Sequence, residues 1–198
     1  MYIPPHFAAS DATELAAFIR AHPFGQLISL VDGRPFVSHI PFLINEHRDH
    51  LVAHVAYQNP QWEGLEDQEV LVVFQGQNGY VSPSLFSSPG VPTWNYQAVH
   101  VYGKVAVFHD ADEKHALVEA LTHEFESRRA TPWEPEYKES MLRSIVGLDL
   151  EITRIEGKFK LSQNRPQKDL AVIARDLAEQ GCDELAARMM SLMDDQAG

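Results

Sequence analysis

A short basic segment stands out near the carboxyl end of an acidic chain. Residues 158–168 read Lys-Phe-Lys-Leu-Ser-Gln-Asn-Arg-Pro-Gln-Lys, whereas the whole chain has 16 Lys and Arg against 28 Asp and Glu. Ammonium, hydroxyl, amide and guanidinium groups are suitable donors for one anion such as a phosphate, and here they come from Lys160, Ser162, Asn164 and Arg165. A solvated basic turn leading into a helix is the alternative interpretation.

A second unusual segment runs from Val70 to Gly103 and contains no Asp, Glu, Lys or Arg over 34 residues. Its glycines and prolines predict that much of it is irregular. An irregular segment that avoids charge is typical of a loop covered by a ligand or a second subunit. Aromatic surface would come from Tyr80, Phe86, Trp94 and Tyr96. A loop folded over its own core remains the alternative.

Other chemistries find little support in the sequence. No Walker loop, Gly-x-Gly-x-x-Gly or Gly-x-Ser-x-Gly motif is present, which argues against the common nucleotide loops and a serine nucleophile elbow. The single cysteine, Cys182, excludes an intramolecular disulfide. The ten histidines form no His-Glu-x-x-His motif, and His39, His54 and His100 fall in different predicted strands, so we expect no metal site.

The elements that must position these residues follow from hydrophobic periodicity and turn signals. Strands are predicted over 26–31, 35–44, 50–57, 69–75, within 91–108 and over 147–155, with a hairpin at Asp32-Gly33. Helices are predicted over 10–21, 110–128, 133–145 and in two pieces after Pro166. This order predicts an α+β fold with a small antiparallel barrel of about six strands and peripheral helices. We expect a single domain over 1–198, with a helical tail over 166–198 packed on the barrel or on a dimer.

The charge balance bears on partners and location. The formal net charge is −12 and the isoelectric point about 5.2, whereas affinity for the nucleic-acid backbone needs clustered Lys and Arg. The charge therefore gives direct DNA binding no support. Neither a signal peptide nor a membrane span is predicted, which favours a cytoplasmic protein without membrane contact.

Six strings in order resemble one family, the PaiB-type proteins, usually described as FMN-binding negative transcriptional regulators. They are Tyr-Ile-Pro-Pro-His-Phe (2–7), Ser-His-Ile-Pro-Phe (38–42), His-Val-Ala-Tyr-Gln-Asn-Pro-Gln-Trp (54–62), Tyr-Val-Ser-Pro-Ser (80–84), Val-Pro-Thr-Trp-Asn-Tyr (91–96) with Val-His-Val-Tyr-Gly (99–103), and Lys-Leu-Ser-Gln-Asn-Arg (160–165). The resemblance covers the chain from residue 2 to about 190. It implies a split β-barrel that binds FMN as a homodimer, with flavin sites at the subunit interface and the uncharged 70–103 segment in that interface.

The resemblance also implies which positions bind the cofactor. The expected flavin-binding residues are Ser38, His39, Ala53, His54, Asn59, Trp94, Asn95, Tyr96, Lys160, Ser162, Gln163, Asn164 and Arg165. One position departs from the family, because Tyr57 stands where a basic residue is common. Either the phosphate depends on Lys160 and Arg165, or FMN binding is weakened.

The biochemical activity stays open at the level of sequence. The resemblance is compatible with a weak flavin-dependent reductase or oxidase activity, but no residue identifies a substrate or an electron donor. Two alternative functions are a haem-binding split barrel, given the histidines, and an apo regulator that acts by protein interaction. Regulation of transcription, if it occurs, is expected to be indirect.

Overall fold

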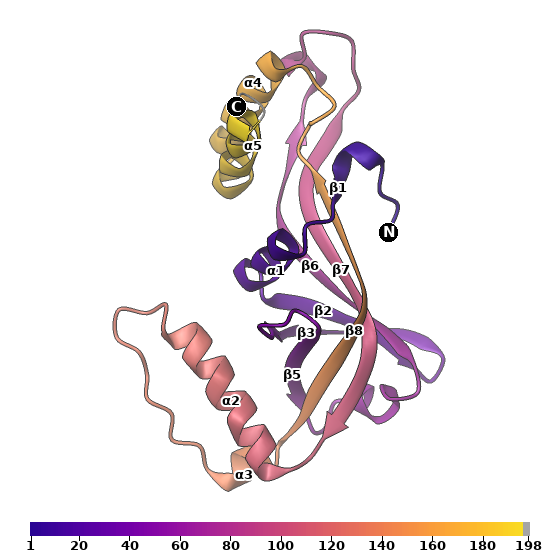
Figure 1. Ribbon diagram of the computed structural model, residues 1–198, viewed down its shortest axis with the longest axis vertical. Helices are drawn as coiled ribbons and strands as arrows, with labels where there is room; N and C mark the ends of the chain where they lie inside the picture. Colours follow the sequence, from indigo (N-terminus) through magenta and orange to yellow (C-terminus); the bar gives the residue numbers. More distant parts are fainter. Residues whose placement is uncertain (196–198) are drawn as a thin grey trace. The chain divides into compact units, whose positions relative to one another are not determined.

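A computed structural model describes residues 1–195 of the chain (Figure 1). Eight strands form one sheet in the order β3-β2-β6-β7-β8-β5-β4, with β1 paired to β8. The strands are β1 (Ala8–Ala9), β2 (Phe24–Val31), β3 (Arg34–Pro41), β4 (Leu43–Ile44), β5 (His50–Ala56), β6 (Glu69–Val81), β7 (Thr93–Phe108) and β8 (Ile145–Lys160).

In the described residues, five α-helices and three short 3₁₀ helices accompany the sheet. The α-helices are α1 (Ala12–Ala21), α2 (Ala111–Glu126), α3 (Glu139–Leu142), α4 (Gln167–Glu179) and α5 (Asp183–Asp195), and the 3₁₀ helices are η1 (Pro5–Phe7), η2 (Pro60–Gly64) and η3 (Pro83–Leu85). Within residues 1–195, no helix has both the length and the apolar character that a bilayer crossing requires.

The chain divides into two compact units. Unit 1 comprises Met1–Leu15, Gln75–Val99 and the chain from Glu156 onward, and unit 2 comprises Ala16–Phe74 and His100–Ile155. The long strands β6, β7 and β8 contribute residues to both units. The expected single-domain organisation over 1–198 stays a prediction.

The β2–β3 hairpin of unit 2 forms where the sequence predicts it. Asp32 and Gly33 both have positive φ, 51° and 71°, which is the backbone twist that a two-residue hairpin turn needs. The predicted strand over 35–44 is interrupted at Phe42, whose N–H donates to the carbonyl of Pro23 at 2.9 Å. The chain then leaves β2, and β4 pairs with β5 instead.

Helix α2 of unit 2 begins with the predicted cap. The Asp110 carboxylate accepts hydrogen bonds from the N–H groups of Asp112 and Glu113, at 2.9 and 3.1 Å, and so satisfies two donors that have no partner within the helix. Its apolar face is buried through Leu117 and Leu121. The helix therefore has a fixed start and one face toward the interior of the unit.

The predicted helix over 133–145 is wrong. Only α3, a four-residue helix, forms in this stretch, and Ile145 already begins β8. The backbone N–H of Trp133 donates to the carboxylate of Glu126 at 2.7 Å rather than to a helical carbonyl. Pro135 follows two residues later, and proline disfavours helical φ and ψ in the residue before it. The apolar residues that suggested a helix belong to a loop anchored on α2.

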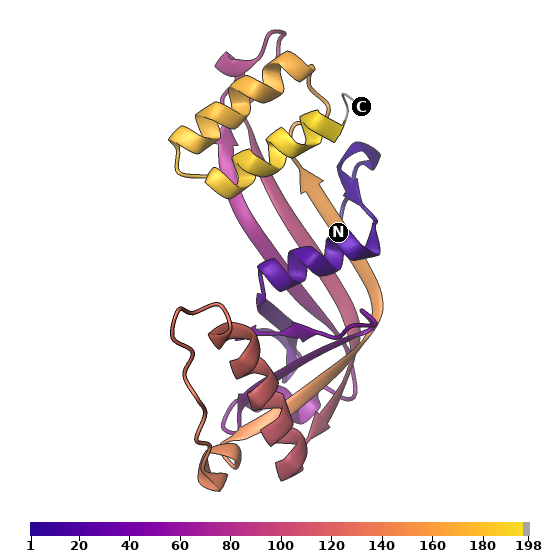
Figure 2. The same cartoon turned by 60° about the vertical axis from the view of Figure 1, so that its left-hand side comes forward.

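In unit 1, helices α4 and α5 run antiparallel as a pair (Figure 2). Gly181, with a φ of +80°, ends the first helix. Gln77 on β6 caps the start of the second helix, because its Oε1 accepts hydrogen bonds from the N–H groups of Glu184 and Leu185 at 3.0 and 3.2 Å. The described part of the predicted tail therefore packs on β6.

The uncharged segment is more regular than predicted. Strands β6 and β7 take up 70–81 and 93–103, so only 82–92 lies outside regular strand. Gly79 interrupts the sequence pattern, but the strand continues through it. Glycine is required at this position because a Cβ there would lie 2.3 Å from Cδ2 of Leu177. This glycine is needed for close packing of the helix pair and does not indicate a loop.

Candidate functional site

A small basic cavity opens in unit 1 at the end of strand β8. It has a volume of about 120 Å³ and is lined by Phe86, Val91, Thr93, Lys160, Ser162, Asn164 and Arg165. The start of β7, the end of β8, the turn before α4 and the 82–92 loop all contribute to it. Five of the lining residues are polar or basic, and none of those that the structure places there is acidic.

Lys160 supplies the first cation of this cavity. Its Nζ donates to the carbonyl of Trp94 at 2.6 Å and to Oγ1 of Thr93. Burial, together with the neighbouring Lys158, lowers the pKa of Lys160 from its ordinary value. Both acceptors are neutral, and among residues 1–195 no carboxylate is recorded as compensating the charge of this half-buried ammonium. An added anion would therefore find a favourable partner.

Arg165 supplies the second cation. Its guanidinium carbon lies 3.8 Å from the centroid of the Phe86 ring, and Nη1 is 3.5 Å from the carbonyl of Pro89. Gly90 makes room for this stacking, because a Cβ there would lie 2.4 Å from Nη2 of Arg165 and from the Phe86 ring. Stacking fixes the guanidinium plane, so its remaining N–H groups form a fork suited to a phosphate or carboxylate.

The turn between β8 and α4 is held by a buried polar pair. Asn95 is fully buried, and its Nδ2 donates to Oγ of Ser162 at 2.9 Å. Ser162 has a φ of 63°, an unusual value for a residue other than glycine, and its carbonyl accepts from the N–H of Arg165 at 2.8 Å. Gln163 closes the turn with hydrogen bonds to the backbone of Leu161 and Phe159. Asn95, Ser162 and Gln163 therefore position the cavity.

The 82–92 loop is tied to helix α4 by one buried acid. Asp169 is 2% exposed as a residue, and its carboxylate accepts from the N–H of Ser87 at 3.1 and 3.2 Å. Hydrogen bonding from Ser87 lowers the pKa of Asp169. The wall formed by Phe86 and Val91 is thereby connected to the turn that carries Arg165.

Aromatic side chains surround the basic residues of unit 1. Trp94 is 53% exposed and meets Tyr80 edge-on, with the ring centroids 5.9 Å apart. The Nζ of Lys158 lies 5.4 Å from the Tyr96 ring and 5.6 Å from the Tyr2 ring. Such flat, exposed rings beside cations suit a planar anionic ligand.

The remaining predicted site residues lie in unit 2. Asn59 links two of the quoted strings, since its Nδ2 donates to Oγ of Ser38 at 2.8 Å and its Oδ1 accepts from the N–H of Gln61 at 2.9 Å. His39 is exposed on β3 and stacks on Phe24 with centroids 6.5 Å apart. Asn59 thus fixes the position of Ser38 relative to η2.

Two neighbours on strand β5 point to opposite faces. Ala53 is fully buried in the core, and the side chain of His54 lies on the other face because strand side chains alternate. Nδ1 of His54 is buried and has no hydrogen-bond partner among the described residues. Burial also lowers the pKa of His54, so this imidazole is neutral at pH 7.

Tyr57 packs against other aromatic side chains. Tyr57 and Trp62 have ring centroids 5.6 Å apart, and Nε1 of Trp62 donates to the carbonyl of Tyr57 at 2.9 Å. His109 meets Trp62 edge-on at 5.3 Å. Where a basic residue is common in the resembling family, this chain therefore has an aromatic cluster.

The predicted residues fall into two sets, one in each unit. Unit 2 holds Ser38, His39, Ala53, His54 and Asn59, and unit 1 holds Trp94, Asn95, Tyr96, Lys160, Ser162, Gln163, Asn164 and Arg165. Lys160, Ser162, Asn164 and Arg165 line one cavity, and their role in binding an anion stays a prediction. Thr93 and Val91 line it too and were not predicted, although both belong to a quoted string.

Comparison with solved structures shows the fold. The flavocytochrome Anf3 from Azotobacter vinelandii matches with a TM-score of 0.65 and 16% identity, covering 80% of this chain and 72% of that one. An FAD- and haem-binding protein from Mycobacterium smegmatis matches with a TM-score of 0.65 and 20% identity, covering 83% and 78%. The predicted α+β split-barrel fold is confirmed, with eight strands instead of about six.

Sequence comparison then assigns the family. The model described as "Putative FMN-binding domain" matches residues 1–154. The "Protease synthase and sporulation protein PAI 2" of Bacillus subtilis is 38% identical over 99% of this chain and 98% of its own length. The chain belongs to this family of FMN-binding-domain proteins and is PaiB-like, as the six strings indicated.

Proposed function

We propose that the protein binds FMN and that the basic cavity of unit 1 holds the FMN phosphate. The observation that carries the proposal is the convergence of Lys160 and Arg165 on one cavity whose described lining has no acidic residue. The family model and the flavin-binding relatives agree with a flavin as the ligand. The roles of the unit 2 set toward the flavin stay predictions from the resemblance.

The size of the cavity limits which part of a flavin it accepts. Its volume is only about 120 Å³. Sites for drug-sized ligands occupy about 300–1,000 Å³, so a three-ring isoalloxazine is too large for it. A phosphate is small enough and would accept donors from both cations and from the polar residues beside them.

A titration with three flavins tests this assignment. FMN, riboflavin and FAD are added to the purified full-length chain, and bound flavin is followed by its visible spectrum and its fluorescence. FMN is expected to bind more tightly than riboflavin, which lacks the phosphate, and than FAD, which lacks a terminal one. The variants Lys160→Gln and Arg165→Gln should each weaken FMN by about 10- to 150-fold, the range for a charge-assisted hydrogen bond.

Lys168→Gln is the matched control, because Lys168 is exposed in the same basic segment and does not line the cavity. In 0.15 M salt, which screens the long-range effect of removing one exposed charge, this variant should leave FMN affinity unchanged within about twofold. Equal affinities for FMN and riboflavin would contradict the phosphate assignment. A chain that retains no flavin of any kind would contradict the function itself.

We also propose a homodimer that includes the uncharged segment. On the outer face of β2 and β3, Phe24, Leu30 and Val37 are 66%, 52% and 44% exposed. Leu71 and Val73, from the uncharged segment, are paired with this part of β2 and are partly exposed. Exposed apolar sheet surface without charge is typical of a subunit interface. Val37→Lys should convert a dimer to a monomer in sedimentation velocity, and an unchanged dimer would exclude this face.

We further propose that the protein acts in the cytoplasm as a flavin-dependent regulator of transcription that works through a protein partner. The net charge of −12 supports indirect action on DNA, and a flavin would supply reversible redox chemistry. Photoreduction of the FMN complex tests the redox part. A specific, salt-sensitive complex of the pure protein with promoter DNA would contradict the indirect part.

A further inference from the structure

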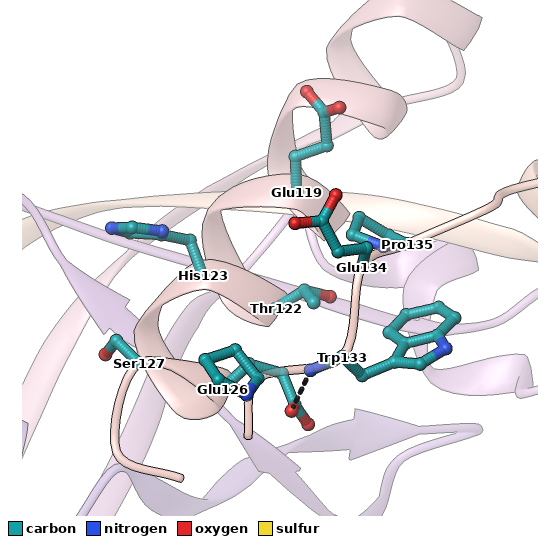
Figure 3. A pocket seen from close by; sticks show the side chains of 9 residues that line it. Glu119, Thr122, His123, Glu126, Ser127, Trp133, Glu134 and Pro135 are labelled. Atoms are coloured by element: carbon teal, nitrogen blue, oxygen red, sulfur yellow. Dashed lines mark hydrogen bonds between the residues drawn. The ribbon is translucent and has the colours of Figure 1, made fainter. Parts of the chain in front are cut away.

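Unit 2 contains a larger cavity that the flavin proposal does not use (Figure 3). It lies between helix α2 and the loop that follows this helix, and its volume is about 490 Å³. The lining residues are Glu119, Thr122, His123, Glu126, Ser127, Pro132, Trp133, Glu134 and Pro135. This volume falls in the range of small-molecule sites.

The charge around this cavity is negative. Three lining residues are glutamates, and the described lining contains no Lys or Arg. Glu126 accepts from the N–H of Trp133 at 2.7 Å and lies 3.6 Å from Arg129, while Glu119 lies 3.5 Å from the imidazole of His115. Arg129 therefore offsets one carboxylate, and the remaining negative charge favours a cation in the cavity.

An exposed indole forms one wall. Trp133 is 54% exposed and meets Tyr137 edge-on, with the centroids 6.0 Å apart. The Tyr137 hydroxyl is hydrogen-bonded to Oγ1 of Thr122 and donates to the carbonyl of Val118 at 3.3 Å. The loop is thus fastened to α2 at both Trp133 and Tyr137, which keeps Trp133 in the lining of the cavity.

We propose that this cavity binds an alkylammonium group carried on an apolar stem. The ammonium would be paired with the glutamates and with the face of Trp133, since an aromatic face attracts a cation within about 6 Å. The methylene stem would contact the two prolines and the indole. The shared chemistry has two sources, a free aliphatic amine or the lysine side chain of another protein.

Nuclear magnetic resonance of the ¹⁵N-labelled full-length chain tests the proposal. The probes are n-pentylammonium and Nα-acetyl-lysine-N-methylamide, and their neutral counterparts are 1-pentanol and Nα,Nε-diacetyl-lysine-N-methylamide. Saturable shifts of the Trp133 indole N–H and the Thr122 amide are expected with the cations only, and they should weaken between 10 and 150 mM salt. Tighter binding of pentylammonium supports a free amine, and tighter binding of the lysine derivative supports a protein side chain.

Three variants assign the effect to the cavity. Trp133→Ala should weaken the cation about 2- to 30-fold and Glu134→Gln about 1.5- to 5-fold, from the strengths of cation–π contacts and exposed ion pairs. Glu136→Gln, in the same loop but outside the lining, should have no effect. Unshifted resonances elsewhere show that a variant is folded. Equal binding of the neutral probes, no shift at millimolar cation, or an equal effect of Glu136→Gln would overturn the proposal.

Discussion

Replacing Gly79 by alanine tests how the α4–α5 pair packs on strand β6. A Cβ at this position would lie 2.3 Å from Cδ2 of Leu177, 3.3 Å from Sγ of Cys182 and 3.6 Å from Cδ2 of Leu185. Leu177 is fully buried, so its side chain must move by about 1 Å into occupied space to restore ordinary contact.

The magnitude follows from two opposing effects. Overpacking a filled core costs about 1–3 kcal/mol, and alanine recovers about 0.5–1 kcal/mol of the backbone entropy that glycine loses in a strand. Gly79→Ala should therefore lower the free energy of unfolding by up to about 2.5 kcal/mol, with a middle value of about 1 kcal/mol. Leu177→Ala alone should cost about 2–5 kcal/mol, because it leaves a cavity.

The double variant distinguishes this explanation from a general effect on the strand. With Leu177 shortened, the new methyl group has room and fills part of the cavity, so the double variant should be more stable than the sum of the single effects predicts, by about 0.5–3 kcal/mol. Urea unfolding followed by tryptophan fluorescence gives the three values. Strictly additive effects would refute the packing argument.

Three further predictions concern pH and the turn that carries the basic residues. Burial lowers the pKa of His54 below its usual 6.5. The contribution of the neutral imidazole to stability is therefore present above pH 6.5 and is lost as the pH falls through the lowered pKa. In a plot of urea midpoint against pH, His54→Gln should flatten the acid side. His50, whose pKa is raised mainly by its hydrogen bond to Asp149, contributes below pH 6.5 and loses this effect as the pH rises through the raised value, so His50→Gln should change the profile in the opposite direction. Ser162→Ala removes the hydroxyl that hydrogen-bonds to both amide atoms of the buried Asn95 and leaves, among the described residues, only Sδ of Met189 for its Nδ2. The variant should cost about 1–3 kcal/mol in thermal or urea unfolding. A loss below about 0.5 kcal/mol would mean that the Asn95–Ser162 pair does not hold the turn.

Local features of the sequence predicted most elements of the fold. The Asp32-Gly33 turn and the Asp110 cap act through backbone geometry and hydrogen bonds within a few residues, so their signals are readable without a structure. Alternating apolar residues likewise placed the strands. The helix predicted over 133–145 failed because a contact between Trp133 and Glu126, seven residues apart, replaces the helical pattern.

The chemistry of the basic segment was also readable, since residue types and the charge contrast require no fold. The sequence alone determined that Lys160, Ser162, Asn164 and Arg165 could serve one anion. Only the tertiary structure decided that Thr93, 67 positions away, meets Lys160 and that Phe86 stacks on Arg165. Such pairings depend on which strands and loops pack together, and that is set by burial over the whole chain rather than by any local pattern.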